Sequence, residues 1–338
     1  MLFRSVSGSV RGGIATAGTA DVSASGASGS SVAADATANI QDSAMRADGN
    51  TVTVRKNAAV RGSLYGGHAS LDVQGGTAAG GMVTGATGVT ADADASVLVG
   101  NSIVSASDNV VSLNGKSTDG GSIYGGYVRW SVAAGTASVA ASGATARADV
   151  VSSGSRALAT NNTVTIGDQA RILGGNTSLY GGYLEAPNHK PERYDVFTGN
   201  TLNFSAQPVS VHTVANFEKY NFTLQPALAN QPTALISAQQ IVLGSNADNL
   251  DSAQAAKASE IRVVGIHSGN ALNTGDQFVL MRAANSLSGS GIGLTSTGML
   301  QQGISLLYDV QTRVDLAGKE VTATILACPA GAGATCPS

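Results

Sequence analysis

The chain has 338 residues, a formal net charge of −3 and no basic block, which argues against nucleic acid as a partner. Only 12% of its residues are charged and 4% are aromatic, whereas glycine occurs 43 times. Such a composition disfavours a wide globular core of leucine and phenylalanine and favours a thin core lined by small aliphatic side chains.

One short motif, a serine and an aliphatic residue followed by Tyr-Gly-Gly, occurs three times, and a decayed copy lies at Ser9 to Gly13. The first glycine of the four copies is Gly12, Gly66, Gly125 and Gly181, so the spacings are 54, 59 and 56 residues. Self-similarity at a long period indicates a stacked repeat architecture. The repeated residues are Tyr65, Gly66, Gly67, Tyr124, Gly125, Gly126, Tyr180, Gly181 and Gly182.

Each full motif is preceded by an alternating segment that begins with asparagine, at residues 50–54, 109–113 and 162–166. The alternation predicts short β-strands, and disorder, which would suit the Ala/Ser/Gly tract at 23–31, does not explain it. A unit of about 57 residues is long for one solenoid turn, so we expect three turns of roughly 19 residues, stacked at ~4.8 Å. The predicted fold is all-β, a parallel β-helix closed by an antiparallel C-terminal cap.

The two glycines of each motif predict a sharp corner, because glycine adopts positive φ without steric cost. The preceding aliphatic residues Leu64, Ile123 and Leu179 should then point inward at equivalent positions. The tyrosines should form a partly exposed stripe along the stack. An aromatic ligand groove is the alternative interpretation, and a structural corner is preferred.

The amino-acid composition changes near residue 191, at a segment (residues 187–193) that contains several charged residues and two prolines. We expect a repeat region at 1–190, final turns and a cap at 191–326, and a tail at 327–338. Tyr220, Phe222 and Leu224 should share one strand face. Further strands are expected at 234–243, 260–266 and 277–281, and residues 305–314 and 320–326 should form an antiparallel hairpin because their connection is short.

The two cysteines, Cys328 and Cys336, lie eight positions apart in the tail. A small-loop disulfide formed in an oxidising compartment and two free thiols in a loose tail are both compatible with this spacing. Zinc is disfavoured, because no histidine lies near them in sequence.

The Asn-led strands, the Tyr-Gly-Gly motifs and the segments at 194–203 and 214–220 resemble the passenger region of type V autotransporters. The resemblance implies a right-handed β-helix displayed on the surface of a Gram-negative bacterium or secreted from it. Residues 273–280 and the following hairpin resemble the autochaperone-like cap of such passengers. The sequence contains neither the signal peptide nor the translocator barrel of the complete protein, so we expect a passenger fragment, a truncated gene or a passenger exported by a separate partner.

No convincing catalytic set, metal-ligand spacing or cofactor motif is present, and no apolar run long enough for a transmembrane helix occurs. The resemblance therefore implies a non-enzymatic protein of the cell surface or outer membrane that acts in adhesion or self-association. Its partners would be the host-cell surface, other bacterial cells or further copies of itself. A carbohydrate-active β-helix enzyme and a non-functional passenger fragment are the alternatives.

Overall fold

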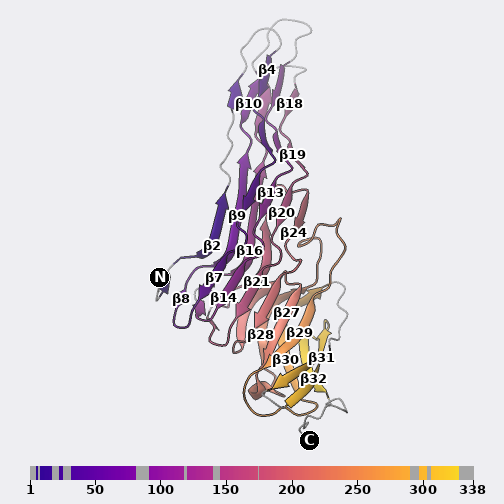
Figure 1. The fold of residues 1–338 in the computed structure, drawn as a ribbon. Helices are drawn as coiled ribbons and strands as arrows, with labels where there is room; N and C mark the ends of the chain where they lie inside the picture. The colour runs from indigo at the N-terminus through magenta and orange to yellow at the C-terminus, as the bar shows by residue number, and fades with distance from the viewer. Residues whose placement is uncertain are drawn as a thin grey trace.

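The computed structural model describes residues 5–6, 8–16, 23–25, 32–80, 91–117, 120–139, 145–173, 175–289, 297–302 and 306–326. These residues form an elongated, all-β molecule that is built mainly of stacked parallel strands (Figure 1). The described part of the chain contains no helix of the length and apolarity needed to span a membrane. Cys328 and Cys336 lie outside the described residues.

Three successive repeats contribute seven strands each, in the same order, and we call each such set a layer. Layer 1 contains β1 (Ser5–Val6), β2 (Val10–Thr16), β3 (Ser23–Ser25), β4 (Val32–Asp35), β5 (Ala38–Gln41), β6 (Ala44–Arg46) and β7 (Thr51–Val54). Layer 2 contains β8 (Ala59–Val60), β9 (Leu64–Gln74), β10 (Thr77–Gly80), β11 (Ala91–Asp94), β12 (Val97–Gly100), β13 (Ile103–Ser105) and β14 (Val110–Leu113). Layer 3 contains β15 (Lys116–Ser117), β16 (Ile123–Ala133), β17 (Thr136–Val139), β18 (Thr145–Arg147), β19 (Val150–Ser153), β20 (Arg156–Leu158) and β21 (Thr163–Ile166).

Each strand of layers 1 and 2 pairs in parallel with the strand at the same place in the next layer. Leu64 pairs with Ile123, and Ile123 pairs with Leu179. Neighbouring strands are thus one whole repeat apart in sequence, so a repeat forms one layer. The prediction of three turns per repeat is wrong, because each layer is a long excursion out and back rather than a compact turn (Figure 1).

The next layers are shorter. Layer 4 contains β22 (Arg171–Ile172), β23 (Leu179–Glu185), β24 (Arg193–Asp195) and β25 (Thr201–Phe204). Layer 5 contains β26 (Val209–Ala215) and β27 (Lys219–Leu224), followed by the 3-10 turn η1 (Pro226–Leu228), and layer 6 contains β28 (Ala234–Leu243) and β29 (Glu260–Ile266). Leu179 pairs with Val214, only 35 positions further on, so the long excursion is lost after layer 3.

The C-terminal strands change the direction of pairing. They are β30 (Gln277–Gly289), β31 (Thr297–Gln302), β32 (Leu306–Asp315) and β33 (Glu320–Leu326). β30 pairs in parallel with β28, while β33 pairs antiparallel with both β30 and β32, and β32 with β31. The predicted hairpin is therefore confirmed as β32 and β33, whereas β31 was not predicted.

Buried side chains become smaller from the C-terminal end of the stack toward its far tip. The C-terminal part holds fully buried aromatic residues, among them Phe204, Phe217 and Phe278. Tyr220, Phe222 and Leu224 are also fully buried on one face of β27, as predicted. The core in the middle of the long excursions is filled mainly by valine and alanine, with two large rings from Trp130 and Tyr194.

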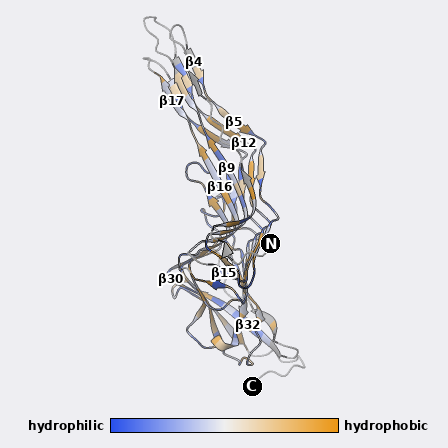
Figure 2. Ribbon diagram, turned by 90° about the vertical axis from the view of Figure 1, so that its left-hand side faces the viewer, coloured by the Kyte–Doolittle hydropathy of each residue, from blue (hydrophilic) through white to orange (hydrophobic). Residues whose placement is uncertain are grey.

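At the tip the described core consists of alanines from β4, β10, β11 and the residues that follow β4 and β11, with Ala137 and Val139 packed against them. Figure 2 shows hydrophobic residues distributed along the whole length of the stack. The core is therefore long and thin, as the composition predicted, and it is thinnest where the excursions turn back.

Candidate functional site

The Tyr-Gly-Gly motifs lie inside the extended strands β9, β16 and β23, not at sharp corners. None of the six glycines has a φ in the left-handed region, so the prediction of corners built on positive φ is wrong. The glycines are required instead because atoms of the neighbouring layer lie too close to leave room for a Cβ atom. A Cβ on Gly125 would lie 2.7 Å from the Cβ of Asn162, and one on Gly67 would lie 2.6 Å from Nδ2 of Asn109.

The glycine pair also shifts the alternation of the strand. In β9 Leu64 is buried before the pair, and Ala69, Leu71 and Val73 are buried after it. The inward position thus changes from even to odd residue numbers. This places Tyr65 and His68, which are three residues apart, on the same outward face, where their rings stack with centroids 5.3 Å apart.

The space left by the glycines is occupied by a ladder of four asparagines, one from each of layers 1 to 4. The amide N–H of Asn50 donates to Oδ1 of Asn109 at 2.8 Å, that of Asn109 to Asn162 at 2.9 Å, and that of Asn162 to Asn200 at 2.9 Å. Asn109, Asn162 and Asn200 are fully buried. The sequence signal for this ladder is the asparagine before each strand, although the alternating pattern by itself predicts only the start of a strand there.

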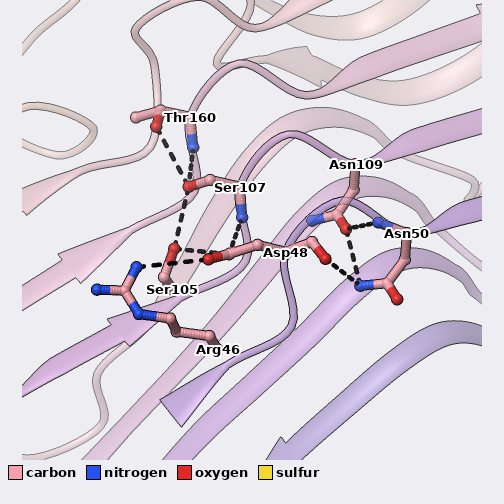
Figure 3. Close-up of polar contacts among 7 residues, drawn as sticks. All are labelled: Arg46, Asp48, Asn50, Ser105, Ser107, Asn109 and Thr160. Carbon is pink, nitrogen blue, oxygen red and sulfur yellow. Dashed lines mark hydrogen bonds and ion pairs between the residues drawn. The ribbon is translucent and has the colours of Figure 1, made fainter. Parts of the chain in front are cut away.

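Beside the first rungs of the ladder, Asp48 connects the layers through a second polar cluster (Figure 3). Its Oδ1 accepts hydrogen bonds from the Ser105 hydroxyl and from the Ser107 N–H, each at 2.7 Å. Arg46 lies 3.6 Å from its other oxygen. Because the carboxylate bonds to groups of the next layer, we interpret the cluster as structural.

On the outward face the rings of three layers form two parallel files, which together we call the aromatic ladder. In one file Tyr65 stacks on Tyr124 and Tyr124 on Tyr180, with centroids 4.9 and 5.3 Å apart and planes within 10°. The second file holds His68, Tyr127 and Tyr183, with the two tyrosines stacked at 5.6 Å. Edge contacts connect the files, for example between Tyr124 and Tyr127 at 5.2 Å.

The predicted tyrosine stripe is therefore present, and its first file is half-buried. His68 takes the position of Tyr127 and Tyr183 in the register. Burial, with the charges of Arg11 and Arg129, lowers the pKa of His68. At neutral pH the ring of His68 is therefore uncharged.

The two ends of the aromatic ladder differ. At the layer 1 end the guanidinium of Arg11 lies 5.2 Å from the centroid of the Tyr65 ring and covers it, a cation–π contact. At the other end Tyr180 pairs with Ala215, which carries no ring. The stacking therefore stops at Tyr180 and Tyr183.

A groove of about 310 Å³ begins at this second end. Its polar side chains include Asn249, whose amide donates to Oδ1 of Asn216 at 3.0 Å and is thereby fixed. The lining consists of Tyr180, Tyr183, Leu184, Val196, Thr213, Ala215, Asn216, Val242, Asn246, Asp248 and Asn249. Of the residues that line this groove, the sequence singled out Tyr180 alone as a repeated site residue.

A second cavity of about 460 Å³ lies among loops near η1 and includes Asp168, Gln225 and His267. It contains no tyrosine, tryptophan or phenylalanine in its lining. Among the described residues no group of three or more potential protein ligands could hold a metal ion. The aromatic ladder and the groove at its end are therefore the strongest candidate site.

No protein-family model, curated protein or solved structure matches this chain. The resemblance to autotransporter passengers stays a prediction, and the functional argument depends on the geometry of the ladder and groove.

Burial raises the pKa of Tyr124 from 10.0 to about 12, so the phenol is neutral at physiological pH. Above pH 10 the unfolded chain loses this proton before the folded chain does. We therefore expect the free energy of unfolding to fall as pH rises from 10 to about 12 and this contribution to level off above that value.

Tyr124→Phe removes the titrating group and keeps the ring, so its unfolding free energy should fall less steeply over that pH range. Denaturant unfolding of both proteins at a series of pH values measures the difference. Identical slopes for the two proteins would contradict the expectation.

Proposed function

We propose that this chain is a non-enzymatic passenger region of a bacterial surface protein, and that it acts in adhesion or self-association. In this proposal the stack of layers is a right-handed parallel β-helix, as in the passengers that the sequence resembles. The observation that carries the proposal is the aromatic ladder, which repeats in register over three layers and ends in an open groove. Repeated equivalent groups allow weak contacts to add through multivalency.

Binding is favoured over catalysis by the chemistry of the groove. Glycoside hydrolysis generally uses two carboxyl groups that flank the scissile bond. Among the residues that line the groove, Asp248 is the one carboxylate. Tyrosine, in contrast, is well suited to contact surfaces, because it combines a large apolar ring with a hydroxyl group at little cost in conformational entropy.

We further propose that β30 to β33 act as a cap. β30 covers the edge of β28 by parallel pairing, and β33 then pairs antiparallel with β30, so in this sheet the parallel stack ends at β30 and presents no open parallel edge for association with another chain. Deletion of residues 273–326 should therefore leave a protein that aggregates, which light scattering with size-exclusion chromatography would detect. A soluble, monomeric and cooperatively folding product would contradict the cap.

Adhesion is tested with purified protein on beads that are mixed with epithelial cells or with one another. The matched variant lacks residues 123–178, which joins Ser122 to Leu179 and restores a Ser-Leu-Tyr-Gly-Gly motif in a stack that is one layer shorter. We expect the intact chain to attach and the shorter chain to attach more weakly, because one rung of each file is gone. Absence of attachment in both assays, together with glycan hydrolysis that Asp248→Asn abolishes, would favour the enzyme alternative.

A further inference from the structure

We propose that the groove at the end of the aromatic ladder binds a neutral sugar ring, stacked on Tyr180 and Tyr183. This inference deepens the proposed adhesive function and rests on it, because it assigns the ligand class of one defined site.

The first argument comes from the stacking itself. Tyr180 is stacked on Tyr124 at an interplanar angle of 8°, and Tyr183 on Tyr127 at 16°. Each ring thus has one face covered by the preceding layer, while the next layer places only Ala215 in register with Tyr180. Both tyrosines also line the groove, so we infer that their opposite faces are open to it and that a ligand ring can take the place of the missing rung.

The second argument comes from the shape of this platform. The centroids of Tyr180 and Tyr183 are 4.9 Å apart and their planes are tilted by 59°, so the two rings form a shallow, angled surface. The face of an aromatic ring carries partial negative charge, and the C–H groups on one side of a pyranose carry partial positive charge. A volume of about 310 Å³ is at the lower end of the range for small-molecule sites and is sufficient for one or two sugar units.

The third argument comes from the polar groups around the platform. Asn246 accepts a hydrogen bond from the N–H of Asp248 through its Oδ1, which leaves its NH₂ group as a donor to a ligand. Asp248 is exposed and offers carboxylate acceptors. Burial raises the pKa of Tyr183, so its hydroxyl remains a donor at neutral pH. Such a mixture of donors and acceptors suits a ring with several hydroxyl groups.

The charge of the groove restricts the sugar further. Asp248 is its only charged lining residue, and no lysine or arginine lines it. A sialylated or uronic sugar would bring a second negative charge next to this carboxylate, which is unfavourable. We therefore infer a neutral glycan.

The test is saturation-transfer NMR of the full chain with lactose, cellobiose, maltose and mannobiose, and with sialyllactose as the acidic comparison, followed by calorimetry on the best neutral ligand. We expect at least one neutral disaccharide to bind, and to bind more tightly than sialyllactose. Tyr183→Ala should weaken its binding about tenfold, the upper range for one aromatic contact. Ala215→Tyr places a ring where the ligand ring would stack. It should therefore block sugar binding while the rings of the aromatic ladder stay in place.

Tyr65→Ala is the control, because it removes a ring at the far end of the aromatic ladder, in the file of Tyr180, that does not line the groove, and it should leave the sugar affinity of the groove unchanged. Failure of all four neutral sugars to bind, or binding that survives both Tyr183→Ala and Ala215→Tyr, would overturn the proposal. Bead attachment by the intact chain without binding of any of the four neutral sugars would reject the sugar site and keep adhesion. Sugar binding without bead attachment would support the site and reject adhesion.

Discussion

Gly126→Ala is expected to destabilise the protein more than any other single methyl addition that we consider. The added Cβ would collide with the backbone carbonyl of Ala106 and lie 2.7 Å from Nδ2 of Asn162. Neither group can move away freely, since Asn162 is a buried rung of the asparagine ladder. Overpacking of a closed core against backbone atoms is one of the mechanisms that cause the largest losses of stability. We therefore expect the free energy of unfolding to fall by about 4 kcal/mol, or the protein to fail to fold.

The measurement is the free energy of unfolding from urea titration followed by circular dichroism. Gly8→Ala is the control, because a Cβ at this exposed glycine meets no atom within 4 Å. It should change stability by no more than about 0.5 kcal/mol. Equal stability of the two variants would show that the glycine is not required for close approach.

Asn162→Ala is the second large expected effect. Oδ1 of Asn162 accepts hydrogen bonds from the backbone N–H and from the side-chain amide of Asn109, at 2.9 and 3.2 Å. Removing it leaves two buried donors without an acceptor, and each such loss costs about 1–3 kcal/mol. We therefore expect a total loss of about 3 kcal/mol in the free energy of unfolding.

Asn39→Ala on strand β5 provides the control for this change, because Asn39 is exposed and its loss should cost less than about 0.5 kcal/mol. The double variant Asn109→Ala/Asn162→Ala should cost less than the sum of the two single changes, since the residues share hydrogen bonds. Additive losses would argue against a connected ladder.

The repeat and its inward aliphatic residues could be predicted from sequence because alternation is a local property. Leu64, Ile123 and Leu179 are each fully buried and paired in one register, as expected from their place before the tyrosine. The all-β class and the hairpin of β32 and β33 follow from the same local patterns.

The length of a layer and the role of the glycines could not be predicted in this way. A glycine pair looks the same in sequence whether it provides positive φ or room for a neighbouring chain. The second role becomes visible only once Asn162 is seen to face Gly125 and Gly126. The polar side of the groove has no repeat signal, because Asn246 and Asp248 lie in a non-repeated loop after β28.

The alanine core at the tip has a consequence for how the molecule opens. Alanine buries little apolar surface, and among the described residues the tip sheets, such as β3–β10–β17, contain three strands each. Because local opening is easiest where few apolar contacts are lost, amide protons there should exchange with solvent well before those of β27, where Tyr220 and Phe222 are fully buried. The molecule would thus fray from its far end inward, while the aromatic ladder and the groove remain attached to the most slowly exchanging part of the stack.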